Sequence, residues 1–150
     1  MKQEIVMRGQ TASGLTETLE FSGIQIENKN MAYKMTEFQL YPSANIAAQP
    51  YEMTGSITAT KTAIAPTDPD FDNDGLIATA LVTSSTSQPA DIDSLVVIND
   101  TYMITQNLIL MVQDSHGNPI NWQCKFKAVK MTDAEMAANN FKQYTISDGS

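Results

Sequence analysis

The sequence predicts a mainly β protein: an antiparallel β-sandwich or jelly roll with one short carboxy-terminal α-helix. Apolar and polar residues alternate in several short segments, and clusters of Gly, Pro, Asn and Asp separate those segments. Thr, Ser, Asn and Gln make up about a third of the 150 residues, a composition that favours strands over helices. About seven or eight short strands with turns between them are typical of a sandwich, and a barrel is the alternative.

Four strands are expected in the amino-terminal half. They cover residues 15–26, 35–41, 51–60 and 75–85. In the first, Leu19 and Phe21 share one face, and the pattern changes phase at Gly23, as it does at a β-bulge. The polar stretches 42–50 and 84–93 are expected to be surface loops.

The clearest strand is INWQCKFKA, residues 120–128. Its apolar residues alternate strictly with polar ones, so one face should point to the core and the other to water. These apolar residues are Ile120, Trp122, Cys124, Phe126 and Ala128. Two apolar segments, 94–98 and 101–114, come before it, with turn residues at 99–100 and at 114–119. We expect the three segments to pair in order as an antiparallel meander.

Residues 132–144 predict the helix. Thr132 and Glu135 have the spacing of a capping box, in which each side chain accepts a hydrogen bond from the backbone N–H of the other residue. One face of this helix is apolar and consists of Ala134, Ala137, Ala138, Phe141 and Tyr144. We expect that face to pack on a sheet, and docking of the helix on a neighbouring subunit is the alternative.

The length fits a single domain over residues 1–150, with residues 1–14 as an amino-terminal arm. A net charge of −8 argues against nucleic-acid binding, and Lys125, Lys127 and Lys130 are expected to form a solvated face or to guard a sheet edge. No apolar run approaches the ~20 residues that cross a bilayer, and the amino terminus lacks the apolar stretch of a secretory signal. We therefore expect a protein made in the cytoplasm, without membrane association.

DPDFDNDG, residues 68–75, places aspartates at alternate positions before a glycine. With Asp70 as the first ligand, Asp72 and Asp74 take the third and fifth positions of a loop that resembles the first half of an EF-hand. The twelfth position holds Leu81 instead of glutamate, and the residues around it predict a strand. Two interpretations are open: Asp70, Asp72 and Asp74 bind Ca²⁺ together with an acid from elsewhere, or the loop is a solvated connection.

The sequence identifies no catalytic residues. His116, the sole histidine, lies in a turn beside Asp114 and Ser115, where adjacent residues cannot adopt the geometry of a catalytic triad. Cys124, the sole cysteine, belongs to an apolar row and is expected to be buried and inert. One Cys and one His cannot supply a standard structural zinc site. We expect no enzymatic activity and no cofactor other than Ca²⁺.

Three features of the chain are used for a comparison with known proteins. They are the Thr-, Asn- and Gln-rich strands, the short carboxy-terminal helix and the stretch TYMITQNLILMVQDSHGNPINWQCKFKAV. In these features it resembles the small all-β virion proteins of bacteriophages, such as capsid, head-decoration or tail subunits. The resemblance implies a structural role in a virion, with copies of the chain and other virion proteins as partners. It also implies symmetric self-assembly through strand edges, the arm and the helix.

A second interpretation comes from another class of protein. The chain could be a Ca²⁺-assisted adhesion or carbohydrate-binding module, in which the aspartate loop lies beside a sugar-binding surface. Tyr33, Tyr41 and Tyr51 are the candidate residues of that surface, since aromatic faces stack on sugars. Packing of these tyrosines in the core or in an interface is the alternative.

Overall fold

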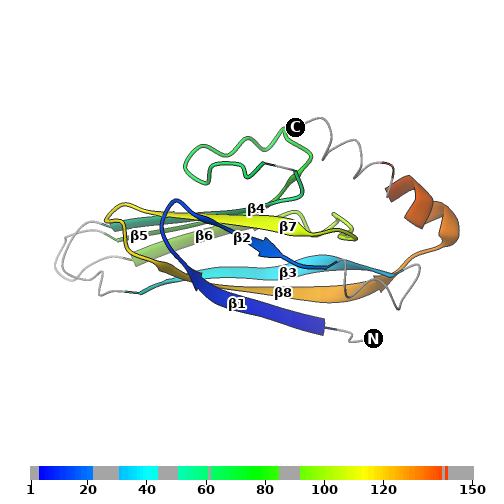
Figure 1. The fold of residues 1–150 in the computed structure, drawn as a ribbon, viewed down its shortest axis with the longest axis horizontal. Helices are drawn as coiled ribbons and strands as arrows, with labels where there is room; N and C mark the ends of the chain where they lie inside the picture. Colours follow the sequence, from blue (N-terminus) through cyan, green and yellow to red (C-terminus); the bar gives the residue numbers. More distant parts are fainter. Residues whose placement is uncertain are drawn as a thin grey trace.

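The structure, a computed structural model, describes residues 4–21, 31–43, 51–60, 62–84, 92–139 and 141. In this part of the chain, eight strands form two antiparallel sheets that face each other, followed by one short helix over residues 133–139 (Figure 1). The mainly β, sandwich-like fold predicted from the sequence is confirmed. Among the same residues, no helix has the length and apolar character needed to cross a membrane.

One sheet has three strands and is organised around the strand that the sequence marks most clearly. Its order is β1 (Glu4–Thr11), β8 (Ile120–Lys130) and β3 (Met31–Pro42). The apolar row of β8 is buried and its polar row faces outward, as the alternation predicts. Lys125 pairs with Glu37 on β3 at 3.3 Å on that outer face. Because β8 is the central strand, its lysines form a solvated face and do not guard an edge.

The other sheet has five strands. Its order is β2 (Thr16–Leu19), β7 (Leu108–Asp114), β4 (Tyr51–Thr58), β5 (Leu76–Ser84) and β6 (Ile92–Ile98). The central strand β4 is buried on both faces, because residues 62–75 pass over the side away from the other sheet (Figure 1). On that side the Ser56 hydroxyl donates a hydrogen bond to the carbonyl oxygen of Ile64 at 2.5 Å.

The core lies between the two sheets. Phe21 and Phe126 meet edge to face, with ring centroids 4.8 Å apart, a favourable geometry for two aromatic rings. Gly55 on β4 faces Phe38 and Leu40 of the three-stranded sheet. A Cβ atom at this position would lie 3.1 Å from the ring of Phe38 and 3.2 Å from the side chain of Leu40. The absence of a side chain at Gly55 therefore sets the spacing of the sheets at that point.

The predicted meander of the last three strands is wrong. β6 pairs with β5, β7 pairs with β2 and β4, and β8 pairs with β1 and β3. The turn after Asp114 therefore carries the chain from one sheet to the other instead of closing a hairpin. The expected strand over 101–114 is also shorter, because only Ile104 makes an isolated bridge, to Tyr33, before β7 begins. Alternation shows which side chains turn inward, but it does not say which strands pair.

Residues 4–11 form the strand β1, where the sequence predicted an arm over 1–14. β1 pairs along its whole length with β8, and Gly9 lies directly against the ring of Trp122. The indole nitrogen of Trp122 donates a hydrogen bond to the Thr11 hydroxyl at 2.9 Å, so the end of β1 is fixed to the core. The bulge predicted at Gly23 lies outside the described residues. The described strands have register shifts between Met35 and Glu37 on β3 and between Ile57 and Thr58 on β4.

The helix begins as predicted, but its apolar face does not pack on a sheet. The amide of Glu135 donates to the Thr132 hydroxyl at 3.1 Å, and the amide of Thr132 donates to the Glu135 carboxylate at 3.4 Å, which confirms the capping box. The described residues of the apolar face are exposed, and Phe141 is 74% exposed. The prediction of packing on a sheet is therefore wrong, while residues 140 and 142–144 lie outside the described ranges. Docking on a neighbouring subunit stays a prediction.

Candidate assembly surface

The strand β6 carries apolar side chains that the rest of the fold leaves in water. Its sequence is IDSLVVI, and six of its seven residues are exposed. Leu95 is 63% exposed, and Ile92, Val96 and Val97 are exposed as well. β8, by contrast, buries every apolar residue of its inward row. An apolar strand of this length at the surface typically marks a contact with another molecule.

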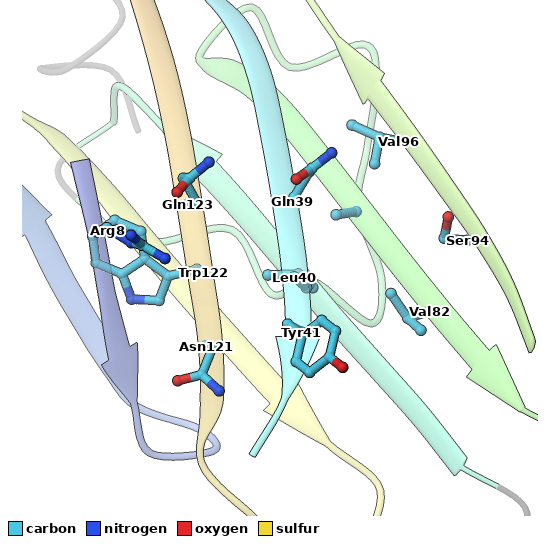
Figure 2. A pocket seen from close by; sticks show the side chains of 11 residues that line it. Arg8, Gln39, Leu40, Tyr41, Val82, Ser94, Val96, Asn121, Trp122 and Gln123 are labelled. Carbon is cyan, nitrogen blue, oxygen red and sulfur yellow. The ribbon is translucent and has the colours of Figure 1, made fainter. Parts of the chain in front are cut away.

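The exposure of β6 follows from its position in the sheet. β6 pairs with β5 on one side, and no described strand pairs with its other side, which we call the outer edge. Ala80 and Val82 of β5 belong to the core, so their partners Val96 and Ser94 turn toward the same face. That inward face extends past β3, because the opposite sheet has three strands and this one has five (Figure 2).

A groove of about 560 Å³ lies where the two sheets are unequal in width. Gln39, Leu40 and Tyr41 of β3 line one side of it. Val82, Ser94 and Val96 line the other side, on β5 and β6 (Figure 2). The groove is therefore continuous with the exposed inward face of β6.

The chemistry of β6 differs from that of a protected edge. Natural edge strands are commonly blunted by lysine, by proline, by a bulge or by short length. β6 contains no Lys, Pro or Gly, and Asp93 is its sole charged residue. Its backbone N–H and C=O groups along the outer edge and its β-branched side chains together suit the addition of another strand.

The aspartates singled out in the sequence lie on an exposed loop before β5. The carboxylate of Asp70 accepts a hydrogen bond from the amide of Asp72 at 3.0 Å, and the side chain of Asn73 accepts one from Gly75 at 2.8 Å. These are local turns that shape the loop without help from outside it. Among the described residues, no three acidic, His or Cys side chains are grouped so that they could hold a metal ion. Calcium binding by Asp70, Asp72 and Asp74 stays a prediction.

The loop nevertheless adjoins the candidate surface. A small cavity of about 130 Å³ lies between this loop and the outer face of β5 and β6. Phe71 and Asp74 line it from the loop, and Thr79 and Val97 line it from the two strands. A molecule that covered the outer face of β6 would therefore also contact the loop.

A polar cluster around Asp114 ties the turn after β7 to its surroundings. The hydroxyl of Tyr51 and the amide of His116 donate hydrogen bonds to the two oxygens of the Asp114 carboxylate, and the rings of Tyr51 and His116 stack with centroids 5.5 Å apart. The amide of Asp114 donates to Ser13 at 2.9 Å. Burial, then the hydrogen bond and charge of Asp114, raise the pKa of Tyr51 well above its ordinary value. Both carboxylate oxygens thus serve to hold the turn.

The three tyrosines proposed for a sugar-binding surface do not share one. Tyr33 and Tyr51 are buried in the core, whereas Tyr41 is exposed beside the groove. That part of the carbohydrate hypothesis is wrong. Cys124 is fully buried, as predicted, and burial strongly raises the pKa of its thiol, which disfavours the reactive thiolate.

Neither the models of known protein families nor the curated protein sequences match this chain. The candidate surface therefore depends on the geometry of β6 alone.

The sequence itself contains a signal for this surface. LVVI, residues 95–98, is a continuous apolar run within a segment correctly predicted as a strand. Such a run is typical of a strand that is covered on both faces. Among the described strands β6 is an edge strand, and its side chains are exposed.

Proposed function

We propose that this protein is a non-catalytic structural subunit that assembles with copies of itself and with companion proteins in a virion. The class that we propose, from the resemblance of the whole chain, is a bacteriophage capsid, decoration or tail subunit. The observation that carries the proposal is β6, an apolar strand that is exposed on both faces and has no described strand along its outer edge.

The energetics favour association through this strand. Full burial of a Leu, Val or Ile side chain contributes about 1.5–3 kcal/mol, and β6 exposes Ile92, Leu95, Val96 and Val97. Association costs about 4–15 kcal/mol in lost translational and rotational freedom. Partial burial of four such side chains in each of two molecules offsets a cost of that size, and backbone pairing adds to it.

The virion assignment is supported by the resemblance of the whole chain to small phage structural proteins. The Thr- and Asn-rich strands and the short terminal helix carry that resemblance. A net charge of −8 favours protein contacts over contact with a packaged genome, because an acidic surface repels phosphates. The exposed apolar face of the helix, with Phe141, offers a second contact surface.

Light scattering after gel filtration, over a wide range of concentrations, tests the proposal directly. We expect the mean mass to rise with concentration above the 16.4 kDa of one chain. Negative-stain electron microscopy of the heaviest fraction is expected to show rings, tubes or shells of regular diameter. A monomer at every concentration would contradict the proposal.

The calcium hypothesis is a separate proposal with its own test. Calorimetric titration of Ca²⁺ into the wild-type protein and into Asp72→Ala measures binding at the loop. Saturable heat that is lost in the variant would support a loop site formed by Asp70, Asp72 and Asp74. The absence of heat in the wild type would dispose of it.

A further inference from the structure

We propose that β6 pairs with β6 of a second copy of this chain, antiparallel and centred on Leu95, so that two five-stranded sheets become one sheet of ten strands. This inference rests on the proposed function and names the partner and the register of the contact. Both follow from the order of residues in IDSLVVI, the sequence of β6.

Pairing rules restrict the registers to a few. Residues that lie opposite each other in antiparallel strands turn their side chains to the same face of the sheet. In β6, Asp93, Leu95 and Val97 lie on the outward face, because the alternate residues Ser94 and Val96 are paired with the core-facing residues of β5. A two-fold axis perpendicular to the sheet must therefore pass through a residue pair such as Leu95 with Leu95.

Among these registers, the one centred on Leu95 pairs the whole strand. It sets Ile92 opposite Ile98, Asp93 opposite Val97 and Ser94 opposite Val96, with Leu95 opposite its own copy. A shift of the centre by one residue, to Ser94 or to Val96, leaves the last two residues at one end of each strand outside the pairing. The register centred on Leu95 therefore makes the most cross-strand pairs.

The charges favour the same register. Two acidic molecules can associate through this strand only if their carboxylates stay apart. In the register centred on Leu95, each Asp93 lies opposite Val97 and four residues along the strand from the other Asp93. Four residues span about 13 Å, which exceeds the screening length of about 8 Å at physiological salt. A register centred on Asp93 would instead bring two carboxylates into direct opposition, which destabilises a sheet.

The contact also covers the apolar side chains that the monomer exposes. Leu95 and Val97 of both copies form one apolar group on the outward face, next to the loop that contains Phe71. On the inward face, Ile92 of each copy meets Ile98 of the other. The contact is isologous, since the same strand serves both copies, and it needs no third component.

Cysteine cross-linking tests the register. Opposite residues in an antiparallel pair have Cα atoms about 4.5–5.5 Å apart, within the range that a disulfide spans. We expect Leu95→Cys to form a disulfide-linked dimer under mild oxidation, seen on a non-reducing gel and reversed by dithiothreitol. Val97→Cys is the matched control, because two copies of residue 97 would lie about 13 Å apart and cannot bridge. The native Cys124 is fully buried and stays in both variants.

A third variant, together with sedimentation of the wild-type protein to measure its self-association, separates a wrong register from the absence of self-association. Asp93→Cys together with Val97→Cys places two cysteine pairs opposite each other and is expected to cross-link as Leu95→Cys does. If the wild type self-associates but Leu95→Cys does not cross-link, or Val97→Cys cross-links equally, the register is wrong and the proposed function stands. If the wild type is a monomer at every concentration, both the inference and the proposed function fail.

Discussion

The two edges of the five-stranded sheet are built differently. β2 has four residues, of which Thr16, Glu17 and Thr18 are polar and exposed, and only Leu19 is buried. β6 has seven residues, mostly β-branched or aliphatic, and exposes them on both faces. Short length and polar side chains are the usual protection of an edge against unwanted pairing. One edge of the same sheet is thus protected and the other is suited to pairing.

The short edge strand β2 is also held in place by hydrogen bonds from the turn that precedes it. The turn between β1 and β2 binds β7 through the amide of Gly14, which donates to the carbonyl oxygen of Val112 at 2.7 Å. The hydroxyl of Ser13 accepts from the amide of Asp114 at 2.9 Å. These contacts hold β2 against its neighbour within the monomer. We therefore propose that the long apolar edge at β6, and not the short polar edge at β2, is the contact surface.

The largest loss of stability is expected from substitutions of apolar residues that are buried between the two sheets. Phe126 is fully buried and meets Phe21 edge to face, so Phe126→Ala should lower the free energy of unfolding by about 3–5 kcal/mol. Leu95→Ala removes a side chain that is 63% exposed and should change it by roughly 0.5 kcal/mol or less in the monomer. Urea denaturation at low protein concentration measures both. A large loss for Leu95→Ala would show that β6 is covered within the monomer, against our interpretation.

A smaller loss of stability is expected when a side chain is added between the sheets at Gly55. Gly55→Ala places a methyl group 3.1 Å from Phe38, and overpacking of this kind costs about 1–3 kcal/mol. A gain of about 0.4–1 kcal/mol from the less flexible unfolded chain offsets part of that cost. The melting temperature should therefore fall. An unchanged or higher melting temperature would mean that the sheets are not in close contact at Gly55.

The polar cluster around Asp114 should contribute still less to the stability of the fold. Tyr51→Phe removes the hydroxyl that donates to the Asp114 carboxylate, which costs about 1–2 kcal/mol when a buried acceptor loses its donor. We expect destabilisation without any change in self-association, because this cluster lies on β4 and at the end of β7, and β5 separates it from β6. Light scattering of Tyr51→Phe beside the wild type provides that control. An altered mass would show that the two edges are coupled.

The smallest effect is a dependence of stability on pH. Burial raises the pKa of Tyr102, just after β6, to about 12 from an ordinary value near 10. The folded state holds this proton more tightly than the unfolded chain, so stability is unaffected by Tyr102 below pH 10 and falls as the pH rises toward 12. Tyr102→Phe should reduce that alkaline loss by about 1 kcal/mol. An identical pH profile in the variant would contradict the assignment.

The fold class and most of the strands could be predicted because periodicity is a local property. The alternation in β8 and the capping box at Thr132 depend only on residues close together in the sequence, and both predictions were correct. The pairing of strands was not predictable in this way. β7 and β8 follow each other in sequence but belong to different sheets, because pairing depends on how the whole set of strands packs.

The candidate surface was missed for a related reason. The sequence of β6 predicts a strand, but exposure depends on the width of the sheet opposite, and that sheet stops at β3. The helix was misjudged in the same way: its apolar face is real, yet nothing in the local pattern says whether the monomer or another molecule covers it. The spacing of Asp70, Asp72 and Asp74 suggested a Ca²⁺ loop, and the structure adds that side chains of Asp70 and Asn73 accept local hydrogen bonds in that loop.

Matched lysine substitutions on the two edges, measured by sedimentation equilibrium, test most directly whether β6 is the contact surface. Leu95→Lys removes an apolar contact from each copy and sets two charges opposite each other. We therefore expect the dissociation constant for self-association to rise about 100-fold or more. Thr18→Lys places the same residue on β2, where Thr18 is exposed, and should leave the constant unchanged. Equal effects of the two substitutions, or a wild-type protein that stays monomeric throughout, would contradict a structural subunit that assembles through β6.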